Sequence, residues 1–466
     1  MPSKLSAQRL YCLKNTNKYG MFRIAKYNFV FNLTTKDKRR IKTSNAVCCK
    51  ICKEFERHAQ GAPGNFTQEQ GGMSMKSRIS ATLAVVATVL MFLATVPISH
   101  AKEFLVGVEV PLTGTLARVG RGTNEGITVA AEAFNRHNPK HKIKLVTVDN
   151  ESSPAKAVAA VEKLASQGVV GITGGYGSNI IGPASDAAEK ARIVYITSGG
   201  TGKELTTRGL KHFFRITNTE GYNKVAKGLF ANWGVKSVSI IYNTKEGTID
   251  LAKDSQRDLT AKGIKVAMHP FDPGISDFKP IVNKVKLQDR SEVIFMVGYE
   301  NDYVGILRAA KVLRPQVKAM VGVWALATPK MATDFPDLMP NVFGTALIPD
   351  PPEFKNAEGK EFFQTQQRMF KKDLDYLNLL GYVQAMLLFE AIKRADEKGT
   401  LAKGGVADEL RRTNKETLIG RVTFDQKGDN ISFEQRMGQH QAGGKIPLVW
   451  PKDYANGRMN YPAVPW

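Results

Sequence analysis

Cysteine is scarce in this chain of 466 residues, and what there is lies near the N-terminus. The four cysteines are Cys12, Cys48, Cys49 and Cys52, so residues 53–466 contain no thiol. Disulfides and thiolate metal ligands are therefore excluded from most of the chain, whose stability must come from packing. The cluster at 48–52 resembles half of a zinc site, but no second Cys or His pair follows at a suitable distance, and we expect no metal.

The motifs of several enzyme classes are also missing. Two glycine-rich stretches, 120–125 and 200–205, begin like a dinucleotide fingerprint, but neither completes the G-x-G-x-x-G spacing. Gly202 and Lys203 lack the earlier glycine and the following Ser or Thr of a phosphate-binding P-loop, and no G-x-S-x-G nucleophile elbow occurs. We therefore expect no catalytic residues and no cofactor.

Acidic residues are few relative to basic ones, since 43 Asp and Glu stand against 66 Lys and Arg. The net charge of +23 would suggest nucleic-acid binding if it were spread evenly along the chain. Residues 1–101, however, hold 16 Lys and Arg against 4 Asp and Glu, which is about half of the excess. We therefore expect no nucleic-acid partner for the remaining body.

Residues 73–101 have the three-part pattern of a signal peptide. Lys76 and Arg78 precede an apolar run at 81–96, and small residues follow, with cleavage expected after Ala101. The run is about 16 residues long, whereas a membrane-spanning helix needs roughly 20. A cleaved signal therefore fits better than a transmembrane anchor, and we expect the protein to be exported to the periplasm.

Residues 1–72 precede this predicted signal, although an export signal normally begins the translated chain. We therefore expect translation to start at Met73 or Met75, which makes 1–72 a mis-called extension. The alternative is a translated but disordered basic arm, because residues 36–42 hold five Lys and Arg with little apolar content.

Residues 102–466 alternate short apolar runs with longer stretches of helical periodicity, which is typical of an α/β fold with parallel strands. The chain is too long for one ordinary core, so we expect two lobes. The expected strands are 104–110, 142–149, 169–173, 193–197, 238–242, 266–270, 293–297 and 319–323. The expected helices are 122–135, 154–167, 222–232, 247–262, 278–287, 303–313 and 382–394.

Two loops rich in glycine and hydroxyl groups, 174–179 and 197–202, directly follow expected strands. In open parallel sheets, ligands bind beyond the carboxyl ends of the strands. Backbone N–H groups can approach a ligand closely in such loops, and at a helix N-terminus they favour a carboxylate. Each loop could also be an ordinary tight turn with a helix cap, and the sequence leaves this alternative open.

Several short segments occur in an order typical of one known family, although each is weak alone. They are 110–114 (VPLTG), 183–186 (PASD), 204–209 (ELTTRG), 214–215 (FR), 419–420 (IG) and 424–429 (FDQKGD). On these segments the chain resembles, over residues 104–450, the branched-chain amino-acid-binding (leucine/isoleucine/valine-binding) proteins of ABC importers. These are type I periplasmic binding proteins.

The resemblance implies two Rossmann-like α/β lobes joined by a three-segment hinge, the Venus-flytrap arrangement, with ligand bound in the cleft. The implied crossovers lie near 216–219, 346–349 and 420–422. Lobe 1 would comprise 102–217 and 348–421, and lobe 2 would comprise 218–347 and 422–466.

The resemblance also implies an exported, monomeric solute-binding protein without catalytic activity. Such a protein carries a small amino acid or related carboxylate to the ABC permease subunits of the inner membrane. Two alternatives stay open, a periplasmic ligand-sensing domain of the same fold and a binding protein for aromatic acids or short amides.

Specific ligand contacts follow from the resemblance as well. Lobe 1 would hold the ligand's carboxylate with Ser178 in the first loop and with Gly199, Gly200 and Thr201 in the second. From lobe 2, Tyr299 would close over the ligand.

The chain departs from the family where the ligand's ammonium group would be paired. The family has an acid after the strand expected at 319–323, where this chain has Trp324. We expect Glu300 or Asp302 to replace that acid if the ligand is an amino acid, because an unpaired ammonium in a closed cleft is costly. Trp324 could instead stack on an aromatic acid.

Overall fold

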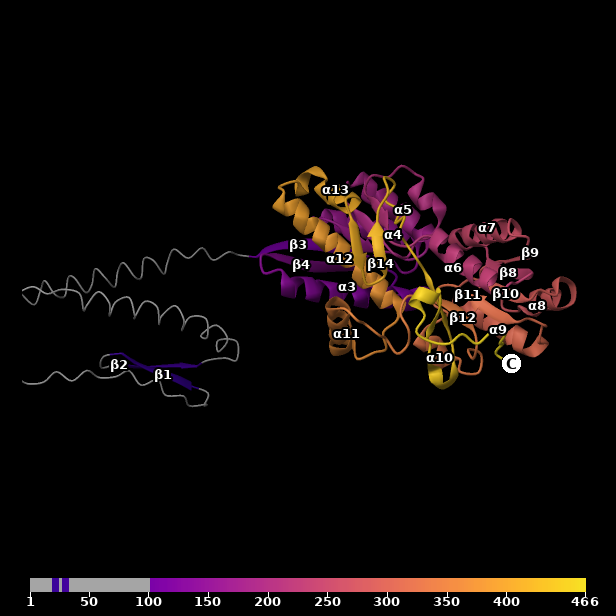
Figure 1. Cartoon of the computed structure of the whole chain (residues 1–466). Helices are drawn as coiled ribbons and strands as arrows, with labels where there is room; N and C mark the ends of the chain where they lie inside the picture. The colour runs from indigo at the N-terminus through magenta and orange to yellow at the C-terminus, as the bar shows by residue number, and fades with distance from the viewer. Residues whose placement is uncertain (1–18, 25–26, 33–100) are drawn as a thin grey trace, which may run out of the picture. The chain divides into compact units, whose positions relative to one another are not determined.

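The computed structural model describes residues 19–24, 27–32 and 101–466 (Figure 1). Strands β1 (Tyr19–Ile24) and β2 (Tyr27–Asn32) pair antiparallel, which the sequence pattern did not predict. The four cysteines and the predicted signal peptide, except Ala101, lie outside the described residues. Within the described ranges, no helix is both long and apolar enough to span a membrane.

Five parallel strands form one sheet of residues 101–466, in the order β4-β3-β5-β6-β7. Successive side chains point to opposite faces, so Tyr195 and Phe213 pack on one face while Ile196 and Phe214 pack on the other. Burial of both faces explains why the inner strands β3, β5 and β6 are largely apolar, whereas the edge strand β4 is only partly buried and contains two lysines. The strands are β3 (Lys102–Val110), β4 (His141–Asp149), β5 (Ile172–Gly174), β6 (Tyr195–Thr197) and β7 (Phe213–Arg215).

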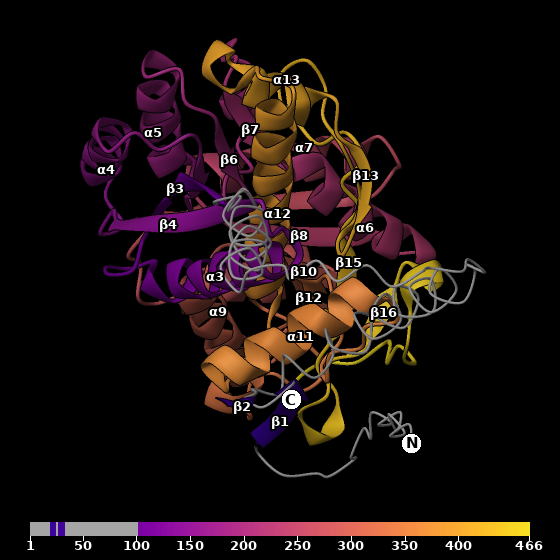
Figure 2. The ribbon, with the colours of Figure 1, turned by 90° about the vertical axis from the view of Figure 1, so that its left-hand side faces the viewer.

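Helices cover both faces of this sheet (Figure 2). The face of Tyr195 packs against α4 (Pro154–Ser166) and α5 (Ser178–Lys190). The other face packs against α3 (Ala117–His137) and α12 (Tyr376–Glu397). Shorter helices α11 (Ala357–Phe370) and α13 (Gly405–Arg411) lie beside α3 and α12.

The second sheet has seven strands in the order β16-β15-β12-β11-β10-β8-β9. The strands from β8 to β12 are parallel, and β15 and β16 add antiparallel to the edge at β12. They are β8 (Ser237–Asn243), β9 (Lys265–Phe271), β10 (Val293–Val297), β11 (Ala319–Gly322), β12 (Phe343–Ala346), β15 (Arg436–Gln439) and β16 (Leu448–Trp450).

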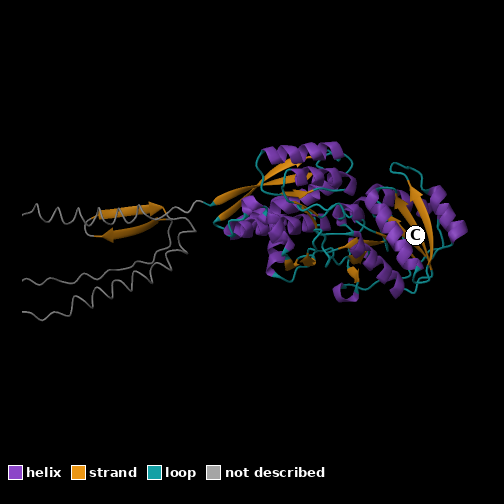
Figure 3. Ribbon diagram, turned by 90° about the horizontal axis from the view of Figure 1, so that it is seen from above, coloured by secondary structure: helices purple, strands orange, loops and turns teal. Residues whose placement is uncertain are grey.

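This second sheet is also covered on both faces, and Figure 3 shows helices flanking the strands of each sheet. On one face lie α6 (Thr219–Asn232) and α7 (Glu246–Thr260). On the other lie α8 (Lys279–Lys284), α9 (Glu300–Leu313) and the short α10 (Pro329–Asp334). The structure thus has the predicted α/β class, with two separately covered sheets.

The chain passes three times between the two sheets. It leaves the first sheet after β7, where the first crossover was predicted, and leaves the second sheet after β12, near the predicted 346–349. The segment 420–422 instead lies in β14 (Gly420–Thr423), which pairs with β13 (Asn414–Thr417) in a separate small sheet, and the chain joins the second sheet only at β15. The exact lobe boundaries stay a prediction.

One ion pair ties the first crossover to the segment before β15. Arg215, at the end of β7, binds Asp429 through Nε at 3.0 Å and Nη2 at 2.6 Å. Its Nη1 also donates to the backbone oxygen of Gly202 at 2.6 Å. The Arg215 side chain therefore connects the second glycine-rich loop with the segment between β14 and β15.

Candidate functional site

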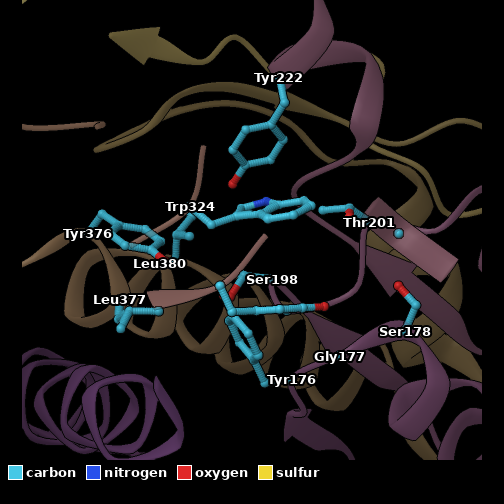
Figure 4. A pocket seen from close by; sticks show the side chains of 13 residues that line it. Tyr176, Gly177, Ser178, Ser198, Thr201, Tyr222, Trp324, Tyr376, Leu377 and Leu380 are labelled. Carbon is cyan, nitrogen blue, oxygen red and sulfur yellow. The ribbon is translucent and has the colours of Figure 1, made fainter. Parts of the chain in front are cut away.

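A pocket lies between the two sheets, at the carboxyl ends of strands from both (Figure 4). Loops after β5 and β6 of the first sheet and after β10 and β11 of the second form much of its wall. Ligands bind at this position in open parallel sheets. The lining residues are Tyr176, Gly177, Ser178, Ser198, Gly199, Thr201, Tyr222, Gly247, Tyr299, Trp324, Tyr376, Leu377 and Leu380.

Aromatic rings fill most of this inner pocket. The rings of Tyr299 and Trp324 are stacked with centroids 6.0 Å apart, and Tyr222 meets Trp324 edge-on at 5.7 Å. The free space is about 20 Å³, which is room for a single water molecule. A larger ligand therefore requires the two halves, or these side chains, to move apart.

The hydroxyls of Ser178 and Thr201 and the leucines of α12 occupy opposite ends of the inner pocket. Figure 4 shows Ser178 and Thr201 at one end and Leu377 at the other. Ser178 is the first residue of α5, and its Oγ accepts a hydrogen bond from the N–H of Gly202 at 2.9 Å. Because Oγ is the acceptor in that bond, its own O–H can donate to an anion, which the N-terminus of α5 also favours. This end of the pocket can hold a carboxylate.

Glycine is required where the two loops approach each other. Gly177 has φ +90°, and its N–H donates to the backbone oxygen of Gly199 at 2.9 Å. A Cβ on Gly199 would lie 2.3 Å from the backbone oxygen of Gly175, so no larger residue fits there. Gly200 does not line the pocket, and it packs against Leu205 instead.

The second loop differs from its sequence-based prediction in one respect. The sequence suggested that either loop could place backbone N–H groups at a helix N-terminus, as the start of α5 does at Ser178. The structure has only a four-residue 3-10 turn there, Lys203–Thr206, and a loop at 207–212 then leads to β7. Thr201 can therefore contribute its hydroxyl and N–H, but no long helix stands behind it.

Three tyrosines of the inner pocket were not predicted from the sequence. Tyr176 stands between the glycines of the first loop, so its place after a strand could have indicated it. Tyr222 and Tyr376 lie at the starts of α6 and α12, where nothing in the sequence marks them. Burial raises the pKa of all three hydroxyls. They stay protonated at neutral pH and can donate hydrogen bonds.

Trp324 is held in place by an unusual turn after β11. Trp324 and Ala325 have φ angles of +34° and +28°, a region that costs non-glycine residues about 1–3 kcal/mol each. The N–H of Ala325 donates to the hydroxyl of Tyr376 at 3.0 Å, and His440 bonds the backbone oxygen of Leu326 at 2.8 Å. These bonds offset part of the strain and fix the indole ring against Tyr222 and Tyr299.

A larger outer cavity of about 520 Å³ adjoins the inner pocket and shares Tyr176, Tyr299 and Trp324 with it. Glu300 and Asp302 lie here rather than in the inner pocket. Glu300 pairs with Arg118 of α3, which also binds Asp375 at 3.1 Å.

Asp302 has partners as well. Its Oδ2 accepts a hydrogen bond from the N–H of Tyr299 at 2.9 Å, which caps the N-terminus of α9. The same oxygen accepts a second hydrogen bond from Asn243 at 3.0 Å. Burial raises the pKa of this carboxyl group. The structure therefore brings Ser178, Gly199, Thr201, Tyr299 and Trp324 together, and it places both predicted ammonium partners outside the inner pocket.

Comparison with known proteins identifies the family. A family model described as periplasmic binding protein matches residues 104–445. The chain belongs to the periplasmic binding protein family. This confirms the family predicted from the sequence and its type of fold.

Relatives cover most of this periplasmic binding protein. A leucine-, isoleucine-, valine-, threonine- and alanine-binding protein of Pseudomonas aeruginosa is 26% identical over 370 residues, covering 78% of this chain and 95% of the relative. A leucine binding protein structure from Thermotoga maritima has a TM-score of 0.66 at 23% identity, covering 74% and 97% of the two chains. A solute binding protein from R. palustris, solved with 4-hydroxybenzoate, has a TM-score of 0.66 at 17% identity, covering 74% and 95%. The names of these relatives describe binding proteins and not enzymes.

Proposed function

We propose that this periplasmic binding protein is the extracytoplasmic solute-binding component of an ABC importer. It binds a small amino acid or related carboxylate between its two halves and delivers it to permease subunits in the inner membrane. The observation that carries this proposal is the inner pocket, where strand ends of both sheets meet around a hydroxyl end and an apolar end. The amino-acid-binding relative from Pseudomonas aeruginosa supports the same ligand class.

The ligand's carboxylate binds at the hydroxyl end of the inner pocket. Ser178 and Thr201 donate their hydroxyl hydrogens, and backbone N–H groups at the start of α5 add to the attraction. The remainder of the ligand lies among the rings of Tyr299 and Trp324, which provide apolar surface.

Binding closes the two halves on each other. Contacts that join them across the pocket in this structure include Arg118 with Glu300 and the N–H of Ala325 with the hydroxyl of Tyr376. Lys203 adds two more, because its N–H donates to Asp250 at 2.8 Å and its Nζ donates to Asp254 at 2.5 Å. These contacts separate when the pocket opens for entry. The protein acts as a monomer, and the predicted signal peptide at 73–101 exports it to the periplasm.

Aromatic monocarboxylates are a second candidate ligand class. Five aromatic side chains line the inner pocket, and no Asp or Glu is among its lining residues in the described part of the chain. The relative from R. palustris was solved with such an acid, 4-hydroxybenzoate.

The proposal is tested by thermal unfolding of the purified protein with a panel of amino acids, aromatic acids and short amides. A ligand that binds only the folded protein raises the melting temperature in a concentration-dependent way, by RT ln(1 + [L]/Kd) in free energy. We expect at least one small carboxylate to do so. The absence of any shift across the panel would contradict the proposal.

A further inference from the structure

The first turn of α7 lies against the hydroxyl end of the inner pocket. α7 covers the second sheet, whereas Ser178 and Thr201 belong to loops of the first. Gly247, the second residue of α7, lines the pocket. A Cβ on Gly247 would lie 2.9 Å from Oγ1 of Thr201 and 3.3 Å from Oγ of Ser178. The two halves are thus in close contact at this point.

Glu246, the first residue of α7, extends its carboxylate across the cleft toward the first sheet. A Cβ on Gly202 would lie 2.6 Å from Oε1 of Glu246 and 3.0 Å from Oγ of Ser178. The acid and the hydroxyl therefore border the same small space beside the backbone of Gly202. A group of a few atoms at the hydroxyl end could contact both.

The Glu246 carboxylate has no hydrogen bond or ion pair within residues 101–466. The two nearby arginines are bound elsewhere, since Arg208 pairs with Asp186 at 2.8 Å and Arg215 pairs with Asp429. Burial, together with the charges of Glu204 and Asp250, raises the pKa of Glu246. An unpaired carboxylate in a closing interface is unfavourable, and a cation placed beside it offsets that penalty.

The other acids near the site differ from Glu246 in this respect. Glu300 is bound to Arg118, and Asp302 is bound to Asn243 and to the backbone of Tyr299. Both line the outer cavity, away from the hydroxyls of Ser178 and Thr201.

We propose that Glu246 binds the ammonium group of the ligand, and that the ligand is an α-amino acid rather than a carboxylate without nitrogen. In an α-amino acid, the ammonium and carboxylate are separated by one carbon, which matches an acid and a hydroxyl that border one small space. Closure of α7 onto the first loop brings the charge to the ligand. This inference rests on the proposed function, because it assumes that a carboxylate binds at Ser178.

Matched ligand pairs test this inference by calorimetry on the purified, exported protein. Leucine is compared with 4-methylpentanoate, and phenylalanine with 3-phenylpropanoate, so that each pair differs only in the ammonium group. We expect the better-bound pair to favour its amino acid by about tenfold or more, the scale of one charge-assisted hydrogen bond. In Glu246→Gln, which keeps the size of the side chain but removes its charge, this preference should fall by about the same factor, while the affinity for the carboxylate stays unchanged or rises.

Glu204→Gln is the matched control, because Glu204 is an exposed neighbour on the first half and should leave the preference intact. If Glu246→Gln does not fold, the preference of the wild-type protein within each pair and the variant Glu246→Asp decide the question. Tight binding of a carboxylate without nitrogen, or an unchanged preference in Glu246→Gln, would overturn the inference and leave the proposed function standing. Failure of all four ligands and of the wider panel to bind would overturn both.

Discussion

The two halves of the molecule contribute to the inner pocket in different ways. The first sheet provides two compact loops, in which Ser178 and Thr201 stand among glycines and present hydroxyls and backbone groups. The second sheet provides single side chains from separate elements, such as Tyr299 and Trp324. The first half therefore has the general chemistry of a carboxylate site. The second half carries the groups that distinguish one carboxylate from another.

The largest expected effect comes from breaking the ion pair between Arg215, at the end of β7, and Asp429, in the segment before β15. Asp429→Asn leaves Arg215, whose side chain is 3% exposed, without its charge partner. We expect a loss of about 3–5 kcal/mol in the free energy of unfolding, measured in urea, because an uncompensated buried charge is strongly destabilising. Lys224→Ala, which breaks an exposed ion pair with Glu434, should cost at most about 1 kcal/mol. Equal losses in the two variants would contradict this prediction.

A buried acid makes the first half sensitive to rising pH. Burial raises the pKa of Glu109 on β3 from 4.5 to about 7, although it is hydrogen-bonded to Tyr195 at 2.6 Å and to Asn150. The folded protein keeps this proton where the unfolded chain loses it, so stability falls as pH rises from about 4.5 to about 7. Glu109→Gln should therefore be more stable than the wild type at pH 8, by on the order of 3 kcal/mol, and similar at pH 4.

This difference is measured by urea unfolding at a series of pH values. Glu103→Gln, an exposed change on the same strand, should keep the pH profile of the wild type. A Glu109→Gln profile parallel to that of the wild type would show that Glu109 does not carry this dependence.

The second half should show the opposite dependence on pH. Burial lowers the pKa of His440 from 6.5 to about 4, with its ring nitrogen bonded to the backbone of Leu326. The unfolded chain binds the proton first, so stability falls as pH decreases from about 6.5 to about 4. His440→Gln should lose this acid-side decrease, which is on the order of 3 kcal/mol. His137→Gln, a change at an exposed histidine, serves as the control. A fall in stability toward low pH that persists in His440→Gln would show that other groups cause it.

The contact between Thr201 and the ligand's carboxylate should contribute less free energy than the changes in unfolding free energy predicted above. Thr201→Ala removes a charge-assisted hydrogen bond to the ligand, worth roughly 1.5–3 kcal/mol, and should weaken binding about tenfold or more. Thr201→Ser keeps the hydroxyl and should bind much more tightly than Thr201→Ala. Calorimetry with the ligand found in the thermal screen measures both, and unchanged affinity in Thr201→Ala would move the carboxylate away from this loop.

The smallest effect is expected at Glu300 in the second half. Glu300→Gln leaves Arg118 with its second partner, Asp375, and the lost pair is partly exposed. Affinity should therefore change by less than about fivefold, the range of a partly exposed ion pair. A large loss in Glu300→Gln would instead assign the ammonium to Glu300, one of the two acids that the sequence suggested.

Much of the fold could be predicted because its determinants are local. The strand at 293–297 has the predicted ends, and most other predicted strands and helices occur within a few residues of their expected places. α5 was not among the predicted helices, and Pro183 inside it removes a backbone donor that a helix would use. β13 and β14 were not among the predicted strands, because four residues are too few to show a periodic pattern, although the segment 419–420 at their turn was among those that carried the family resemblance.

The α/β class, the family and the two glycine-rich loops follow from the order of residues along the chain, because each is a pattern or a succession of segments that does not depend on how the chain packs. Which tyrosines surround the inner pocket depends on packing, since Tyr222 and Tyr376 come from helices far apart in the sequence. The tertiary structure also decided that Glu300 has a partner and that Glu246, among residues 101–466, has none. The strength of a charge interaction depends on distance and burial, and neither is fixed until the two halves are packed together.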